Sequence, residues 1–145
     1  MQSSYPADRQ VPGFTAFLLL LGMLLASCGT TLKFGVSSVV PAAEGKVIIK
    51  TDKNQNHAVM VKVGRLAVPE RLTPPYEEYV VWMETGEHAI RNIGRLKSRS
   101  SALTNSLSAS LKTVTSLEPR SFFITAEHDG DTQVPGPLVV LRTQD

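Results

Sequence analysis

The chain has 145 residues, and 15 lysines and arginines against 13 aspartates and glutamates give it a formal charge of +2. This balance excludes an acidic or basic tail protein and gives no electrostatic bias toward nucleic acid. The length predicts one domain. The chain has a single cysteine, which excludes an internal disulfide, so the folded part must rely on an apolar core.

The first expected element is an N-terminal export signal. Thirteen uncharged residues run from Phe14 to Ala26, after a short polar segment that contains Arg9. As a helix this run would be about 20 Å long, which is short of the ~30 Å hydrocarbon core of a bilayer. The run is therefore more typical of a signal peptide than of a membrane span.

The cysteine, Cys28, directly follows Leu25, Ala26 and Ser27. A leucine, two small residues and a cysteine resemble the lipobox of bacterial lipoproteins, in which the thiol carries a diacylglycerol. The resemblance implies a cleaved signal peptide over residues 1–27 and a lipid on Cys28 that anchors the chain in the cell envelope, on the periplasmic face or in the outer membrane. The alternative is an uncleaved anchor, which the weak positive charge before the apolar run favours.

After the cysteine, residues 28–43 are expected to be a lipidated, flexible tether that contributes at most a first edge strand. This stretch is rich in small residues and contains Pro41. The β-branched run at residues 45–51 and the alternating segment at residues 58–66 then predict a hairpin, with a polar turn between them.

The second half of the chain predicts further short strands. Residues 79–84 form one, and a turn at Thr85 and Gly86 leads into residues 88–96. The polar residues 97–101 are expected to be exposed. Residues 102–117 are ambiguous, because their leucine spacing suits a helical face while their serines and threonines disfavour a helix; a short helix or an irregular crossover is expected.

The chain ends with two more expected strands, at residues 121–127 and 138–143. A turn at residues 129–130 and a proline-rich loop at residues 135–137 lie between them. Six or seven short strands with turn signals between them predict an all-β fold. We expect a single antiparallel immunoglobulin-like β-sandwich of about seven strands over residues 44–145, preceded by a signal peptide helix and the tether.

Two stretches in about the last seventy residues carry a further pattern. The first is YVVW at residues 79–82, with Gly86 and IGRL at residues 93–96; the second is FFITAE at residues 122–127, a turn at residues 129–130 and PGPLVVL at residues 135–141. In this order they resemble the anti-sigma-K factor C-terminal domain family, which implies an extracytoplasmic β-sandwich of a membrane regulator. Only about a dozen residues precede the apolar run, too few for that family's sigma-binding domain, so direct binding of a sigma factor is not expected.

The candidate ligand contacts are Tyr79 and Trp82, because aromatic rings can stack on sugars. A tryptophan in such a strand more often fills the core between the sheets. The histidines lie far apart in sequence and lack metal-ligand spacing, which favours ordinary surface positions: His57, His88 and His128.

Two charged clusters are candidates for binding. The carboxylates of Glu127, Asp129 and Asp131 could form a calcium loop, but a hairpin turn with solvated acids is the more typical arrangement. A basic cluster could meet lipid phosphates or protect an edge strand from aggregation, and it comprises Arg91, Arg95, Lys97 and Arg99.

No G-x-S-x-G elbow or glycine-rich phosphate loop occurs, so no catalytic residue, metal or cofactor is expected. We expect a non-enzymatic envelope lipoprotein whose sandwich acts as a binding, sensing or scaffold module. The alternative is a glycan- or peptidoglycan-binding lipoprotein module, and a third possibility is a dedicated partner of an envelope complex. The expected partners are the membrane, through the lipid on Cys28, and an envelope protein or glycan, but not nucleic acid.

Overall fold

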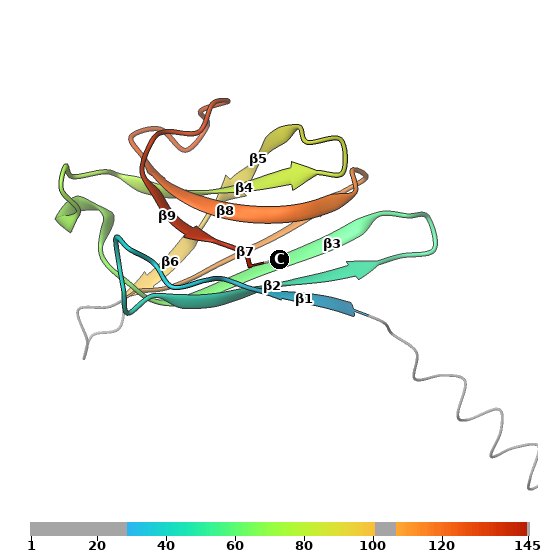
Figure 1. Ribbon diagram of the computed structural model, residues 1–145, viewed down its shortest axis with the longest axis horizontal. Helices are drawn as coiled ribbons and strands as arrows, with labels where there is room; N and C mark the ends of the chain where they lie inside the picture. The colour runs from blue at the N-terminus through green and yellow to red at the C-terminus, as the bar shows by residue number, and fades with distance from the viewer. Residues whose placement is uncertain (1–28, 101–106, 145) are drawn as a thin grey trace, which may run out of the picture.

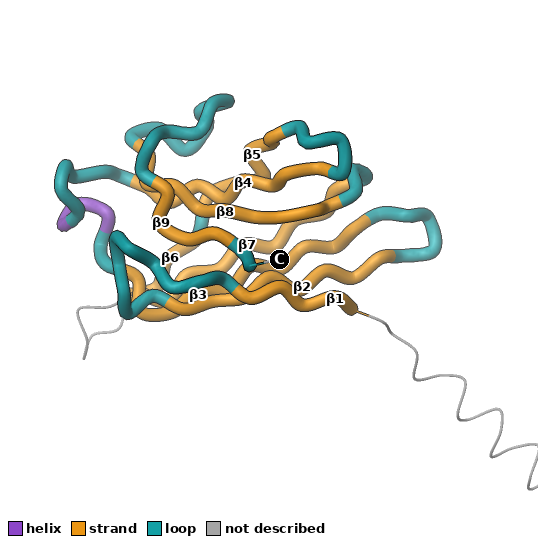
Figure 2. Tube along the Cα trace, viewed as in Figure 1, coloured by secondary structure: helices purple, strands orange, loops and turns teal. Residues whose placement is uncertain are grey.

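The computed structural model describes residues 29–100 and 107–144, which form a two-layer β-sandwich (Figures 1 and 2). The larger sheet has five strands, in the order β1 (Gly29–Lys33), β2 (Glu44–Thr51), β3 (His57–Leu66), β7 (Leu107–Thr115) and β6 (Lys97–Ser100). The smaller sheet has four, in the order β5 (Ile90–Arg95), β4 (Glu78–Thr85), β8 (Pro119–Glu127) and β9 (Val139–Arg142). Every strand pairing is antiparallel.

A short 3-10 turn, η2 (Pro69–Arg71), lies between β3 and β4. In the part of the chain that the structure describes, no helix has the length and apolar character needed to cross a membrane.

The core lies between the two sheets and follows from strand alternation. Successive side chains of a strand point to opposite faces, so every second residue of β2 and β3 faces the smaller sheet. The inward residues of both sheets are buried and apolar, and they include Val47, Ile49, Val59, Val61, Val63, Tyr79, Val81, Met83, Phe122, Ile124 and Ala126. Their removal from water is the main stabilising contribution to the fold.

The two sheets are also joined along both sides. Phe34 forms a β-bridge with Thr143, and the backbone N–H of Gly35 donates to the carbonyl of Arg142 at 2.9 Å. This contact links the end of β1 to the end of β9. On the opposite side, β5 leads through Leu96 directly into β6, so the chain itself passes from one sheet to the other.

The structure confirms the all-β sandwich and corrects the expected element at residues 102–117. The helix or crossover expected within residues 102–117 is wrong, because residues 107–115 form the strand β7; residues 101–106 lie outside the described residues. Leu107 and Ala109 are buried and alternate with exposed Ser108 and Ser110. This period of two is the pattern of a strand, and the helical spacing of the leucines concealed it.

The polar residues expected to be merely exposed after residue 96 form β6. With β1 they raise the number of strands above the seven expected from the turn signals. The remaining expected strands at residues 79–84, 121–127 and 138–143 correspond to β4, β8 and β9.

The sandwich begins at Gly29, although residue 44 was the expected boundary. Residues 29–33 pair with β2 along their whole length, and Phe34, Val40 and Ala43 are buried in the core. The small residues of this stretch serve a tight turn, in which the Ser37 hydroxyl accepts the Val40 N–H at 2.9 Å. Residues 29–43 are therefore part of the domain, whereas the expected signal peptide helix and Cys28 lie outside the described residues.

Because β2 and β3 are closely paired, we expect two glycines to differ in how well they tolerate substitution by alanine. A Cβ at Gly45 would lie 2.5 Å from the carbonyl oxygen of Lys62, whereas a Cβ at Gly64 meets no atom within 4 Å. We expect Gly45→Ala to lower the free energy of unfolding by roughly 1–3 kcal/mol, since the strands must move apart. Gly64→Ala is the matched control and should leave the urea midpoint nearly unchanged. Equal midpoints for the two variants would contradict this packing.

Candidate functional site

A row of lysines crosses the outer face of the larger sheet from one edge to the other. Lys33 on β1 is paired with Lys46 on β2, which is paired in turn with Lys62 on β3. Lys62 lies opposite Ser110 on β7, and Ser110 lies opposite Lys97 on β6. Because paired residues point to the same face of a sheet, all four lysine side chains leave the sheet on one side.

A shallow hollow of about 790 Å³ lies along this row. The residues between the lysine side chains are small, so the bottom of the hollow is not filled. At Gly64, for example, the space that a Cβ would occupy is open. We refer to this hollow as the lysine hollow, and its lining includes Lys33, Lys46, Lys62, Lys97, Ser108, Ser110, Gly64 and Glu44.

The electrostatics of the lysine hollow favour an anion. Like charges placed opposite one another on neighbouring strands destabilise a sheet, so fold stability does not explain this row. Within residues 29–100 and 107–144, none of its lysines forms an ion pair, and Glu44 at the rim is paired with Arg65. The hollow therefore presents several ammonium groups that can bind phosphate, sulfate or carboxylate oxygens.

An apolar groove of about 310 Å³ adjoins the lysine hollow on the same face. Ile48 and Met60 are paired with each other across β2 and β3, and Val114 on β7 is 67% exposed. Two more lysines, Lys50 and Lys112, line this groove. We refer to the combined surface as the cationic face: Lys33, Lys46, Lys50, Lys62, Lys97 and Lys112 with Ile48, Met60 and Val114.

The expected ligand contacts Tyr79 and Trp82 are both buried, with exposures of 3% and 0%. Tyr79 lies in the core between the sheets, where its hydroxyl donates to the carbonyl of Ala67 at 3.0 Å and burial raises its pKa to about 12. Trp82 points to the outer face of the smaller sheet, where it packs with Val80 and Phe123. Neither ring is open to stack on a sugar, and the expectation that Trp82 fills the core between the sheets is wrong.

A chain of hydrogen bonds connects Trp82 to the loop between β8 and β9. The indole Nε1–H donates to Thr125 Oγ1 at 2.7 Å, and the Thr125 hydroxyl donates to Glu127 Oε1. The backbone N–H of Gly136 donates to the same carboxylate oxygen at 2.7 Å. These contacts fix the loop to the outer face of the smaller sheet, and we call Trp82, Thr125, Glu127 and Gly136 the tryptophan clamp.

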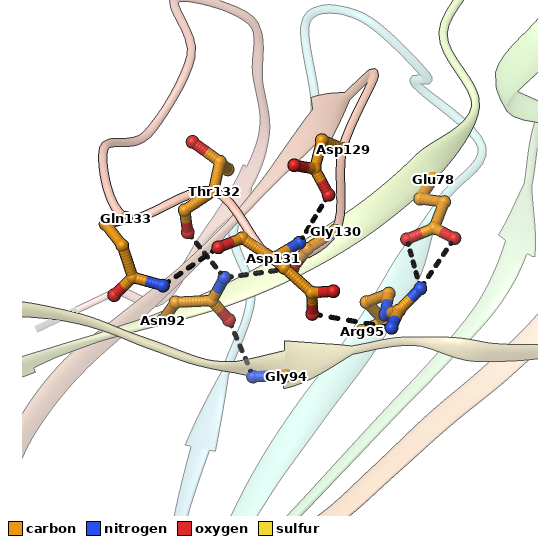
Figure 3. Close-up of polar contacts among 9 residues, drawn as sticks. All are labelled: Glu78, Asn92, Gly94, Arg95, Asp129, Gly130, Asp131, Thr132 and Gln133. Atoms are coloured by element: carbon orange, nitrogen blue, oxygen red, sulfur yellow. Dashed lines mark hydrogen bonds and ion pairs between the residues drawn. The ribbon is translucent and has the colours of Figure 1, made fainter.

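The other end of this loop is held by β5, as Figure 3 shows. The Asn92 side-chain amide donates to the carbonyls of Gly130 and Thr132 at 3.0 and 2.8 Å, and its oxygen accepts the Gly94 N–H at 2.9 Å. Arg95 pairs with Glu78 at 3.1 Å and with Asp131 at 3.4 Å. The hydrogen bond that Arg95 donates to Glu78, followed by the charge of Asp131, raises the pKa of the Arg95 guanidinium.

The carboxylates considered for a calcium loop have separate partners. Glu127 belongs to the tryptophan clamp, Asp129 Oδ1 accepts the Asp131 N–H at 2.9 Å, and the Asp131 side chain pairs with Arg95. In the described part of the chain, no cluster of three or more His, Cys, Asp or Glu side chains could hold a metal ion. These contacts shape the loop, and the three carboxylates do not converge on a common point.

The three histidines lie at separate places. His57 contacts the Thr51 hydroxyl at 3.0 Å, and the His128 ring stacks on Tyr76 with 4.9 Å between centroids. His88 lies 2.9 Å from Glu84 Oε1 at the turn between β4 and β5.

A cluster of polar side chains surrounds Glu84, but its geometry differs from that of a catalytic triad. The Ser121 hydroxyl donates to Glu84 Oε2 at 2.9 Å, and Arg120 Nη1 lies 2.9 Å from His88 Nε2. A nucleophilic serine must contact the histidine that takes its proton, whereas Ser121 contacts the carboxylate. The hydrogen bonds from His88 and then Ser121 lower the pKa of Glu84.

The basic cluster expected at residues 91–99 is divided between the two sheets. Arg91 and Arg95 belong to β5, and Lys97 and Arg99 belong to β6. Of Arg91, Arg95 and Lys97, whose side chains the structure describes, Lys97 lines the lysine hollow. The sequence reasoning missed the lysines on the other strands, although Lys62 lies between the buried Val61 and Val63, and Lys46 lies beside the buried Val47. Their alignment in one row depends on strand register, which the sequence pattern does not give.

The fold and the site thus define a β-sandwich domain with a cationic sheet face. Comparisons of the chain with protein-family models, curated proteins and solved structures found no match.

The tryptophan clamp predicts a specific cost for losing one hydroxyl. Thr125→Val keeps the side-chain shape but leaves the Trp82 Nε1–H without its partner, which should lower the free energy of unfolding by roughly 1–3 kcal/mol. Urea unfolding followed by the fluorescence of the chain's single tryptophan measures this change. Thr31→Val, at an exposed position of β1, is the matched control and should shift the midpoint little. A wild-type midpoint for Thr125→Val would contradict the clamp.

The lowered pKa of Glu84 predicts a pH-dependent contribution to stability. A carboxyl group whose pKa is lower in the folded state stabilises the fold above its unfolded pKa, and this contribution disappears as the pH falls through the folded value. We therefore expect Glu84→Gln to lower the thermal midpoint at neutral pH, and we expect the difference from the wild type to shrink as the pH falls below the pKa of an unperturbed glutamate, about 4.3. Glu87→Gln, exposed in the same turn, is the control. A difference that stays constant with pH would contradict the assignment.

Proposed function

We propose that the chain is a non-enzymatic lipoprotein of the bacterial cell envelope, in which a lipid on Cys28 anchors a β-sandwich that acts as a binding, sensing or scaffold module. The observation that carries the proposal is that β1 begins at Gly29, directly after the cysteine of the lipobox-like sequence. The described core residues all lie from Phe34 onward. Cleavage before Cys28 would leave this described core intact.

The lysine hollow supports a binding role for the module. Its lysines lie opposite one another in a sheet, where they repel, and the described structure gives them no acidic partner. An anionic ligand or surface would remove this repulsion on binding, so the hollow is better explained by a partner than by stability.

The finer assignment of the fold as immunoglobulin-like is part of this proposal. The strand order β2-β3-β7-β6 in one sheet and β5-β4-β8-β9 in the other supports it. Immunoglobulin-type sandwiches have the corresponding orders A-B-E-D and C′-C-F-G, so that β1 would be an added edge strand. A kinship with the anti-sigma-K factor C-terminal domain family also remains a proposal, which rests on the motifs named above and is extended to the fold alone.

The alternative of a glycan- or peptidoglycan-binding module loses its stacking platform, because Tyr79 and Trp82 are buried. The lysine hollow takes the place of these residues as the surface where we propose that a partner binds.

The anchor predicts the behaviour of two variants. Cys28→Ser should accumulate as an unprocessed precursor, because the thiol that accepts the lipid is absent. Ser27→Ala keeps a small residue at the preceding position and should be processed normally. Mass spectrometry of the N-terminal peptide of the membrane-bound protein measures both the cleavage and the added lipid mass. Normal cleavage and membrane retention of Cys28→Ser would overturn the proposed anchor.

A further inference from the structure

We propose that the cationic face is a membrane-docking surface, which lies on an anionic phospholipid bilayer with lipid phosphates in the lysine hollow. This inference rests on the proposed function, since the lipid on Cys28 would hold the domain at the bilayer. It goes beyond that function because it names the surface that binds, the partner and the orientation of the sandwich.

The first support is the charge of the cationic face. Alternation and register direct six lysines outward from this sheet. Of the described residues on the same face, Glu44 is the only acidic one, and it is paired with Arg65. The full chain has a formal charge of only +2, so positive charge is concentrated on one side of the molecule. A basic surface of this kind is attracted to the negative potential of anionic lipids.

The second support is the shape of the lysine hollow. A lipid phosphate is a compact anion whose oxygens accept several hydrogen bonds. Lys46, Lys62 and Lys97 stand around a floor on which Ser108 and Ser110 add hydroxyl donors. The hollow is open and shallow. A lipid headgroup could therefore bind in it while the lipid remains in the bilayer.

The apolar groove distinguishes a bilayer from a soluble polyanion. A dissolved polyanion would contact the ammonium groups and leave Ile48, Met60 and Val114 in water. At a bilayer these side chains can enter the interfacial region while the lysine stems extend beside them toward the phosphates. The mixture of lysines and apolar residues on one face therefore favours a membrane surface.

The position of the anchor gives the third support. Cys28 directly precedes β1, and β1 is an edge strand of the sheet that bears the cationic face. One residue spans about 3.5 Å at most, so the lipid would hold this sheet close to the bilayer. Figure 1 shows the larger sheet on one side of the sandwich and the β8–β9 loop on the other. The face on the β1 side is thus the one that the anchor brings to the lipid.

Site-resolved lysine acylation of the full chain, reconstituted in vesicles, tests the proposal. One set of vesicles contains phosphatidylcholine alone, and the other contains phosphatidylcholine mixed with phosphatidylglycerol. We expect Lys46, Lys62, Lys97 and Lys112 to react several-fold more slowly in the anionic vesicles. Lys53 lies in the β2–β3 turn, outside the face, and should react equally in both. Lys33 and Lys50 are left out of the readout, because Lys33 shares β1 with the anchor and Lys50 is paired with Gly29.

A pair of double variants separates the surface from net charge. Lys46→Glu/Lys62→Glu should abolish the protection of Lys97 and Lys112, since each lysine contributes roughly fivefold to binding at an anionic surface. Lys53→Glu/Arg71→Glu makes the same change in net charge at exposed residues outside the face and should preserve the protection.

Three results would overturn the proposal. The first is equal reactivity of the face lysines in both kinds of vesicle. The second is equal protection in neutral vesicles when inorganic phosphate is added, which would indicate a site for a free small anion. The third is protection in intact envelopes but not in anionic vesicles, which would indicate a protein or glycan partner. If residue 28 proves unmodified, the retained apolar segment still holds the chain in the vesicle, so failure of the proposed anchor can be distinguished from failure of docking.

Discussion

The register between β2 and β3 is the constraint on which both faces of the larger sheet depend. It places Val47 opposite Val61 on the inner side and Lys46 opposite Lys62 on the outer side. A shift of one residue would exchange the two sets, burying lysines and exposing valines. The apolar core thus enforces the register, and the register in turn fixes the positions of the lysines. The lysine hollow is a consequence of how the core packs.

Much of this architecture could be predicted from local patterns. The alternating residues 58–66 and the β-branched residues 45–51 identify a hairpin because each has one apolar face and a polar turn lies between them. β7 was missed, since its leucines happen to repeat at helical spacing while its buried Leu107 and Ala109 also fit a strand. Residues 29–33 were expected to belong to a tether that contributes at most a first edge strand, because their small and polar residues give a weak strand signal; they pair with β2 along their whole length.

The candidate site was harder to predict than the fold. Tyr79 and Trp82 drew attention as aromatic residues, but both belong to β4, a strand that is covered on both faces. The sheet core covers Tyr79, and the β8–β9 loop covers Trp82 through the tryptophan clamp. A sequence pattern gives the face of a strand but does not show that a distant loop returns to cover it. The lysine row could not be predicted for a similar reason, because its residues come from four separate strands.

The start of β1 at Gly29 also has a mechanical consequence. If residue 28 is fixed to the bilayer, a force that separates the domain from the lipid acts first on the pair formed by Gly29 and Lys50. A force applied at the end of an edge strand breaks its hydrogen bonds one after another. Unpairing of β1 from β2 would then lengthen the segment that joins the domain to the bilayer, while the chain remains attached to the lipid.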